Sequence, residues 1–196
     1  GYSKRKDWEH VGVAPVNLRE KFIGLIDREA EISRNGGKGH IIAKMNSLSD
    51  PSITRALYRA SMAGVKIQLI IRGICILKPG VPGVSENIEV KSILDRFLEH
   101  SRIFWFANGG NEELFISSAD WMSRNLDRRV ELLFPVYDEK VRSQLTDLLK
   151  DYQRAQAHAR YLQTDGSYMR PTGYRKEDSF RIQMTLLRRA KKKLTN

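Results

Sequence analysis

HIIAKMNSLSDPSITRALYRASMAGVKIQLIIRG, residues 40–73, is the stretch that decides the fold. It opens with a short apolar run at 40–46 and closes with a nearly continuous apolar run at 65–73, typical of a strand covered on both faces. Between the runs, Asp50 and Pro51 indicate the start of a helix, and Gly64 indicates its end. Because a strand, a helix and a strand follow in order, the sequence predicts a parallel sheet with crossover helices, an α/β fold.

The flanking sequence adds further elements of the same kinds. Asn17 is placed to cap a helix that Gly36 and Gly37 end. Helical spacing predicts further helices over 91–99 and 138–160, and the basic run at 187–193 resembles the end of another. The predicted strands are RIFWF (102–106), ELFIS (113–117) and RVELLFPV (129–136), and a turn signal at 108–111 joins the first two.

The composition is that of a folded protein with a basic surface. The chain has 196 residues, 41% of them hydrophobic, and a net charge of +11, which suits one domain with a core, with or without an arm. This positive excess indicates nucleic acid, a phosphate-rich substrate or a membrane surface as partner, although a solvated basic surface gives the same count. No apolar run approaches the roughly 20 residues that span a bilayer. The single cysteine, Cys75, fits a reducing compartment, so we expect a cytoplasmic protein.

Several common catalytic motifs are missing from the sequence. GGKGH (36–40) lacks the spaced glycine and the Lys-Ser/Thr pair of a phosphate-binding P-loop. There is no GxSxG motif of a serine hydrolase. The four histidines have no metal-ligand spacing, so we predict no metal ligands within this chain; they are His10, His40, His100 and His158.

Two groups of residues are candidates for a site. Arg72 follows the end of a buried strand, where ligands bind in open α/β sheets, and its planar fork suits phosphate oxygens. His100 precedes one strand, and Ser117 and Ser118 end the next, so they share one end of the sheet if the strands align. Imidazole can act as nucleophile or acid at neutral pH. A surface arginine in a mobile loop and a structural histidine bonded to a carbonyl remain the alternatives.

Three stretches carry a family resemblance: 41–88, FLEHSRIFWF (97–106) and SSADWMSRNLDRRVELLFPV (117–136). They resemble the C-terminal region of bacterial polyphosphate kinases, which make polyphosphate from ATP. The resemblance implies a phospholipase D-like α/β domain with a mixed, mostly parallel sheet flanked by helices. It also implies a remnant or linker at 1–10, the second of two such domains at 11–168, and a basic C-terminal arm at 169–196.

The resemblance also implies roles for single residues. His100 matches the second family histidine, an acid/base that contacts the nucleotide, and Arg72 matches an arginine that binds ATP phosphates. Ser117 and Ser118 match a small-residue turn that lines phosphate. Glu131 lies where related enzymes keep a carboxylate that orients the histidine.

The sequence departs from the wider superfamily at two positions. Arg102 replaces the lysine of the His-x-Lys pattern, which keeps the positive charge for phosphate. Ala107 stands where the aspartate is expected, which argues against ordinary phospholipase or nuclease chemistry. No other histidine lies in the context of the family's phosphorylated one, so we expect that nucleophile upstream of Gly1 and expect the chain alone to be inactive.

The implied function is reversible transfer of the γ-phosphate of ATP to a polyphosphate chain through an upstream phosphohistidine, with Mg²⁺. The implied partners are upstream domains and further copies of the whole enzyme, without specific nucleic acid; the basic tail is a candidate membrane contact. Candidates for a polyphosphate channel are Lys44, Lys78, Arg124 and Arg128. A dimeric phosphodiesterase or nuclease and a non-enzymatic polyanion-binding module remain the rival functions.

Overall fold

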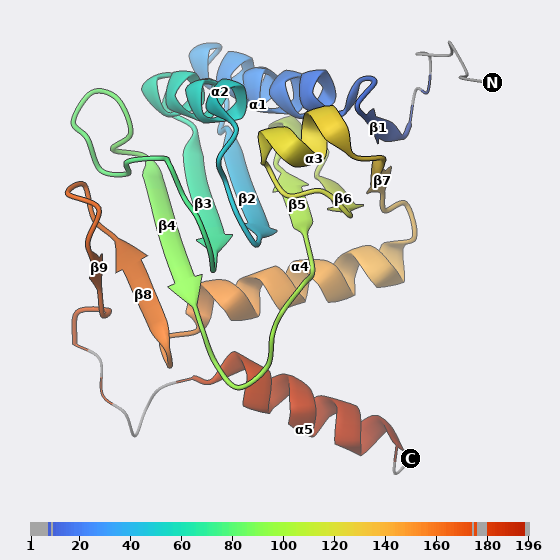
Figure 1. The fold of residues 1–196 in the computed structure, drawn as a ribbon, viewed down its shortest axis with the longest axis vertical. Coiled ribbons are helices and arrows are strands. Elements are labelled where there is room, and N and C mark those ends of the chain that lie inside the picture. Colours follow the sequence, from blue (N-terminus) through green and yellow to red (C-terminus); the bar gives the residue numbers. More distant parts are fainter. Residues whose placement is uncertain (1–7, 9, 174, 176–179, 195–196) are drawn as a thin grey trace.

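A nine-stranded sheet with helices on both faces forms the described part of the chain (Figure 1). The structure, a computed structural model, describes residues 8, 10–173, 175 and 180–194. Most of the expected linker (1–10) and parts of the expected arm (169–196) therefore lie outside the described residues. No helix in the described ranges has the length and apolar character to cross a bilayer.

The elements have the following bounds. The strands are β1 (Gly12–Ala14), β2 (His40–Met45), β3 (Lys66–Ile71), β4 (Ile88–Ile93), β5 (Ile103–Phe106), β6 (Glu113–Ser117), β7 (Glu131–Pro135), β8 (Ala159–Leu162) and β9 (Tyr168–Met169). The helices are α1 (Leu18–Arg34), α2 (Pro51–Met62), α3 (Ser123–Arg128), α4 (Glu139–Arg154) and α5 (Ile182–Leu194), with a 3-10 turn at Asn108–Gly110.

The sheet is mixed, with the strand order β1-β7-β6-β5-β2-β3-β4-β8-β9. The predicted β-α-β unit is confirmed, because β2 and β3 pair parallel and α2 connects them. β3 and β4 also pair parallel, whereas the outer neighbours pair antiparallel. Parallel pairing is thus confined to the centre of the sheet, a smaller share than the sequence pattern predicted.

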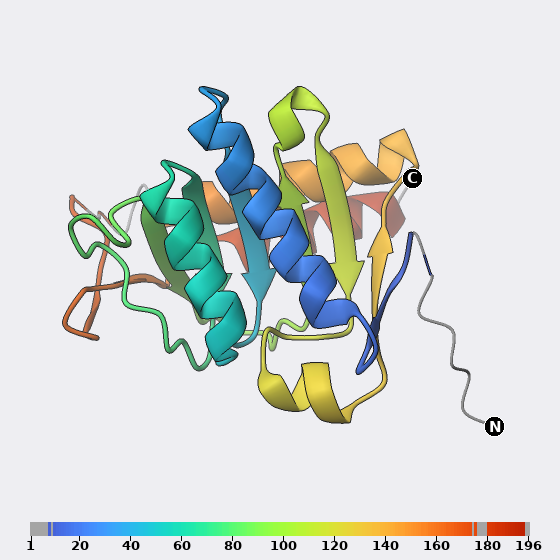
Figure 2. The ribbon, with the colours of Figure 1, turned by 90° about the horizontal axis from the view of Figure 1, so that it is seen from above.

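The two faces of the sheet bury separate cores. α1 and α2 cover one face and α4 covers the other (Figure 2). Side chains alternate along β2 accordingly: Ile41 and Ala43 pack toward α1 and α2, and Ile42 packs toward Leu149 and Tyr152 of α4. Because both faces are covered, the central strands are almost wholly apolar, which is the pattern that identified them in the sequence.

The helix predicted over 91–99 is wrong, because its first residues belong to β4. Lys91 pairs with Tyr161 of β8 in the sheet. Its buried ammonium donates to carbonyls that end α4, including Ala155 O at 3.3 Å. The helix C-terminus favours a cation there. Lys91 and Ser92 are neighbours in β4, so they point to opposite faces of the sheet, and both are buried. The spacing of residues in the sequence could not reveal that these two polar side chains are covered by protein.

Two other details differ from the prediction, the cap of α1 and the end of α4. α1 begins after Asn17 as expected, but the Asn17 side chain accepts from Val13 N at 2.8 Å and does not cap the helix. α4 ends at Arg154, and the chain then forms the edge strands β8 and β9, which the weak pattern after 160 did not predict.

The register gathers several strand ends at one edge of the sheet. β2 and β3 end there, β5 begins there because it is antiparallel to β2, β6 ends there and β7 begins there. The predicted meeting of the histidine strand with the two serines is therefore confirmed. Residues at or next to these ends are Asn46, Arg72, Arg102, Ser117, Ser118, Asp120 and Glu131.

The Asp120 carboxylate ties three of these segments together. It accepts from Asn46 N at 2.7 Å and from the Asn46 amide, and it forms a two-point ion pair with Arg102 at 3.0 and 3.1 Å. Burial alone would raise the pKa of Asp120, but the donors from Arg102 and Asn46 outweigh it and lower that pKa. Gly73 completes the junction, because a Cβ there would lie 2.9 Å from Asn46 O.

An aromatic cluster packs next to the segment that carries Asp120. Phe104 of β5 stacks on Trp121 with ring centroids 5.1 Å apart, and Phe22 of α1 contacts both rings. All three are fully buried, and Trp121 follows Asp120 directly. Removing the indole should therefore disturb both the core and the position of the carboxylate.

Trp121→Ala should lower the free energy of unfolding by about 3–5 kcal/mol, because a large buried side chain is lost and leaves a cavity. Urea unfolding followed by circular dichroism measures this change. Tyr137→Ala, at a residue that is 70% exposed, is the control and should stay within about 0.5 kcal/mol of the parent. Equal effects of the two changes would contradict the assigned role of Trp121.

Asp120→Asn should cost about 3 kcal/mol at pH 7, because Arg102 loses its buried partner. Since the pKa of Asp120 is lowered on folding, its contribution is present above the unfolded pKa near 3.8 and is lost as pH falls through the folded value. The difference in unfolding free energy between parent and variant should thus stay constant from pH 7 to about pH 5 and shrink as pH falls below 3.8. A difference that does not shrink below pH 3.8 would contradict the ion pair.

Candidate functional site

His100 lies on the 94–102 segment that joins β4 to β5 and reaches toward α5 (Figure 1). Its side chain is exposed, and its ring makes no hydrogen bond to the part of the chain that the structure describes. Its main chain, in contrast, is held: His100 O accepts from Arg102 Nη1 at 3.0 Å. The imidazole is therefore presented to solvent from a fixed backbone.

Arg72 is positioned directly beside this segment. Its Nε donates to Glu99 O and to Asn46 Oδ1, both at 2.8 Å. Neither Nη1 nor Nη2 bonds to another described residue, so the outer edge of the guanidinium remains available to a ligand. Two free N–H groups side by side match the oxygens of a phosphate group.

The Glu99 side chain anchors the segment from the opposite side. Its carboxylate pairs with Lys44 Nζ at 3.1 Å and accepts from Tyr152 Oη at 2.6 Å. Lys44 also donates to Ser101 Oγ at 3.0 Å, so one buried ammonium holds residues on both sides of His100. Burial lowers the pKa of Lys44 although Glu99 opposes this, and burial together with the Glu99 hydrogen bond raises the pKa of Tyr152.

Gln183 of α5 completes the clamp on the segment. Its amide donates to Glu99 Oε1 and to Phe97 O, both at 2.8 Å, and accepts from Phe97 N at 2.7 Å. The side chain is buried, with 4% exposure. The beginning of α5 is therefore part of the structure that fixes His100, and not only a basic extension.

Arg102 lies in the site, but its donors are largely engaged by the protein. Asp120 and His100 O take bonds from all three of its nitrogens, and its side chain is 11% exposed. The guanidinium thus holds the main chain of His100. Ala107, where the superfamily aspartate is expected, follows the opposite end of β5 and packs against the core beneath α4.

The serine hydroxyl protons are also used within the protein. Ser117 Oγ donates to Leu132 O at 2.7 Å, and Ser118 Oγ donates to the Glu131 carboxylate. Glu131 is buried and also accepts from Asn125 Nδ2 at 3.2 Å. No hydrogen bond among the described residues joins Glu131 to His100. The geometry therefore does not bring these two residues together as the resemblance implied.

The four channel candidates divide into two groups. Lys44 is 3% exposed and paired with Glu99, so its expected place in an open channel is wrong; β2 points it at Tyr152 under α4. Lys78, Arg124 and Arg128 are exposed, Lys78 on the loop after β3 and the two arginines on α3.

Sequence reasoning missed the residues that hold the site together: Asn46, Glu99, Asp120, Tyr152 and Gln183. Asp120 had a signal, because it follows the two singled-out serines at the end of a predicted strand. Gln183 had none, since its partner lies 84 residues away in the sequence.

The arrangement can bind and neutralise phosphate and can move a proton. No group of three or more His, Cys, Asp or Glu side chains within the described residues is placed to hold a metal ion. The edge therefore offers an imidazole and a guanidinium for phosphoryl chemistry.

The solved structures that resemble this chain agree with its fold. A polyphosphate kinase from Porphyromonas gingivalis covers 97% of the chain with 29% of its own, at 40% identity and a TM-score of 0.88. A phospholipase D family member, Nuc from Salmonella typhimurium, covers 78% of the chain at a TM-score of 0.57 and 16% identity, which shows the fold alone.

Curated relatives are similar along nearly the whole chain. The polyphosphate kinase of Rhodopirellula baltica is 54% identical over 186 residues, 95% of this chain and 22% of its own length. That of Synechocystis is 56% identical over 169 residues, 86% of this chain and 23% of its own length. The chain thus spans about a quarter of the length of these relatives. The family model described as polyphosphate kinase C-terminal domain 2 matches residues 11–183, and the chain belongs to the polyphosphate kinase family.

Proposed function

We propose that the protein containing this chain transfers the γ-phosphoryl group of ATP to the end of a polyphosphate chain, reversibly, and that this domain supplies the phosphate-binding and acid/base groups. One observation carries the proposal. Arg72 fixes the main chain next to His100 through Glu99 O at 2.8 Å, its two terminal nitrogens bond no described residue, and the His100 side chain is exposed. A cation and a titratable group held together in this way suit phosphoryl transfer, which depends on positioning and charge neutralisation.

Arg72 acts as the phosphate-binding residue in this mechanism. Its Nε is engaged by Asn46 and Glu99, so the guanidinium keeps one orientation before substrate arrives. The open edge then faces the phosphates without reorganising, which is the condition for electrostatic stabilisation of the equatorial oxygens. ATP enters with Mg²⁺ on its phosphates, and the cation supplies additional neutralisation of charge.

His100 acts as the acid/base in this mechanism. A histidine nucleophile outside this chain attacks the γ-phosphorus, the bond to the β-phosphate oxygen breaks, and ADP leaves. In the second half, the phosphoryl group passes from that histidine to a terminal oxygen of polyphosphate. Protonated His100 donates its proton to the β-phosphate oxygen of ADP as that oxygen leaves in the first half, and it takes a proton from the attacking terminal phosphate of polyphosphate in the second half.

The positions of His10 and His40 support an external nucleophile, while His158, with Nε2 3.8 Å from Asp95 Oδ1, lines a separate hollow. His40 bonds Gln68 at 3.0 Å and contacts Trp105, and His10 bonds Tyr137 at 2.7 Å; both lie away from the edge that carries His100. The segment beside His100 exposes apolar side chains, including Phe97 at 47% and Leu98 at 80%. Exposed apolar residues next to a reactive group suit contact with upstream domains of the same polypeptide.

The proposal includes a cytoplasmic homo-oligomer. Burial raises the pKa of the Cys75 thiol to about 11, so this cysteine stays protonated and unreactive, as suits a reducing compartment that contains ATP. The last turns of α5 expose lysines and arginines, which offers a contact for an anionic membrane or a neighbouring subunit.

His100→Ala in the complete enzyme should lower kcat for polyphosphate synthesis at least about a hundredfold, because general acid/base help is lost. The pH–rate profile should also lose one of its limbs. Labelled ATP with product sizing measures the rate, and His10→Gln is the control. A near-normal rate in His100→Ala would contradict the role. Synthesis by the 196-residue chain alone, or phosphodiester cleavage without ATP, would contradict the mechanism.

Arg72→Lys in the complete enzyme should raise KM for ATP about tenfold or more, because a lysine keeps the charge but loses the two-point contact with phosphate. Steady-state kinetics over an ATP series measures this change. Arg55→Lys, at an exposed residue of α2 that bonds Ser52, is the matched control and should leave KM unchanged. An unchanged KM in Arg72→Lys would contradict phosphate binding by this side chain.

A further inference from the structure

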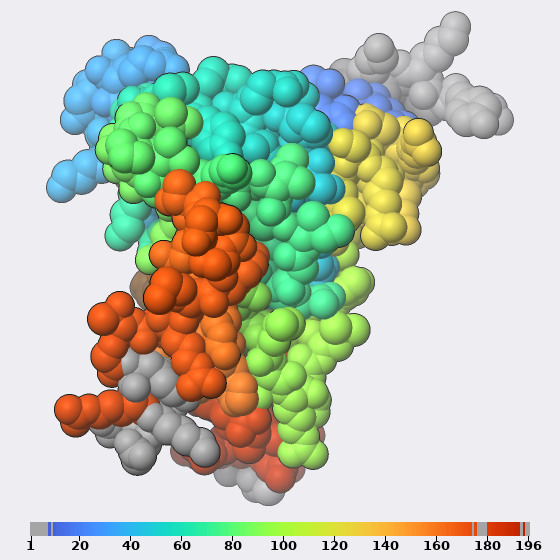
Figure 3. All heavy atoms as spheres, turned by 60° about the vertical axis from the view of Figure 1, so that its left-hand side comes forward, coloured from blue at the N-terminus to red at the C-terminus, as the bar shows by residue number. Residues whose placement is uncertain are grey.

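A second hollow lies on another face of the molecule, between β8, the end of β4 and the start of α5 (Figure 3). Its volume is about 620 Å³, within the range of ligand pockets. Neither His100 nor Arg72 lines it. The lining residues are Ser92, Leu94, Gln156, Ala157, His158, Ala159, Arg160, Arg170, Pro171 and Arg181.

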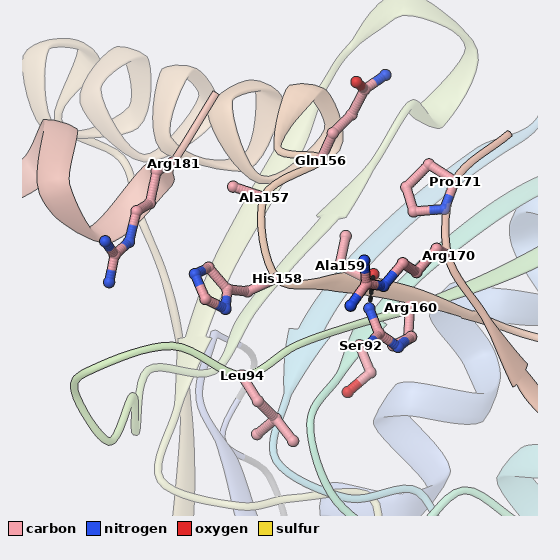
Figure 4. A pocket seen from close by; sticks show the side chains of 10 residues that line it. All are labelled: Ser92, Leu94, Gln156, Ala157, His158, Ala159, Arg160, Arg170, Pro171 and Arg181. Atoms are coloured by element: carbon pink, nitrogen blue, oxygen red, sulfur yellow. Dashed lines mark hydrogen bonds between the residues drawn. The ribbon is translucent and has the colours of Figure 1, made fainter. Parts of the chain in front are cut away.

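The hollow is strongly basic (Figure 4). Arg160, Arg170 and Arg181 line it together with His158, and no carboxylate does among the residues described. Asp95 holds Arg181 at 2.6 Å, and the Asp95 side chain is 2% exposed. Three guanidinium groups and one imidazole therefore line the hollow.

The backbone of His158 supports a binding role. His158 has a φ of 59°, the left-handed region that a side chain adopts at a cost of about 1 kcal/mol. Its Nε2 lies 3.8 Å from Asp95 Oδ1, and the imidazole projects into the hollow (Figure 4). Such backbone outliers persist where the surrounding structure holds them and collect at ligand sites.

The chemistry of the lining selects the class of ligand. All permanent cations are arginines, which present forked donors to phosphate oxygens, and they are spread over three elements, so they suit several linked phosphates better than one. No Phe, Tyr or Trp side chain is among the described lining residues, so the hollow lacks the large rings on which a nucleotide base stacks best. The small side chains Ala157, Ala159 and Ser92 leave space for an unbranched chain.

We propose that this hollow is a second binding site for linear oligophosphate, separate from the site at Arg72. The inference rests on the proposed function, since it gives the phosphate polymer a further point of attachment. Leu94, which lines the hollow, begins the 94–102 segment that carries His100. A phosphate chain held here is therefore anchored next to the segment that performs the reaction.

The test is isothermal titration of the full chain with tripolyphosphate, in an Arg72→Gln background that removes the other site. Adding Arg160→Gln and Arg170→Gln should weaken binding at least tenfold and reduce its salt dependence. The matched control adds Arg34→Gln and Arg55→Gln, exposed arginines of α1 and α2, and should bind as the background does. Unchanged binding after loss of Arg160 and Arg170, or equal loss in the control, would overturn the proposal.

Further arms keep the result decisive. Thermal unfolding checks that each variant folds, and Arg170→Glu, at an exposed residue, provides a second variant that should weaken binding more than Arg170→Gln. If the Arg72→Gln background binds ATP more tightly than tripolyphosphate, the assignment to oligophosphate is overturned. It is also overturned if the Arg160 and Arg170 changes abolish binding to anionic phospholipid vesicles but leave tripolyphosphate binding unchanged. Because the readout needs no turnover, normal synthesis by His100→Ala would refute the proposed function and leave this inference standing.

Discussion

The position of the Asp120 carboxylate is the constraint on which the rest of the site depends. It joins the end of β2, through Asn46, to the start of β5, through Arg102. Arg102 in turn holds His100 O, and Asn46 holds Arg72. A buried carboxylate is costly unless donors surround it, and here those donors are the residues that position the reactive groups. The same hydrogen-bond network therefore stabilises the fold at this edge of the sheet and orients the residues of the site.

The 94–102 segment is irregular, yet side chains from several elements hold it. Glu99 receives Lys44 from β2, Tyr152 from α4 and Gln183 from α5. Its carbonyl receives Arg72, which directly follows β3. Irregular segments are usually the most mobile parts of a domain, so this number of polar contacts indicates that the backbone beside His100 is fixed while the imidazole remains accessible.

The sequence predicted the strands and helices that follow from local patterns of apolar residues. It did not predict the features that depend on contacts between residues far apart in the chain. The apolar runs at 40–46 and 65–73 gave the central strands, and the order of strands placed Arg72 and the two serines at one edge. The 91–99 segment failed because Lys91 satisfies the end of α4, a partner more than 60 residues away. Lys44 failed for the same reason: its charge indicated a surface, whereas Glu99 and Tyr152 make a buried position tolerable. Family resemblance gave the roles of His100 and Arg72, which no spacing rule could supply.

The contact between α5 and the 94–102 segment bears on how this region can be engineered. The polar link ends at Gln183, in the first turn of a helix that continues to Leu194. Arg189, further along the helix, also pairs with the buried Asp151 of α4, so a fused tag or a cross-linker belongs beyond that residue. Trimming the chain to a boundary chosen from the sheet alone, after β9, would instead detach the amide that holds Phe97 and Glu99. What looks like a dispensable tail is, in its first turn, a brace for the reactive segment.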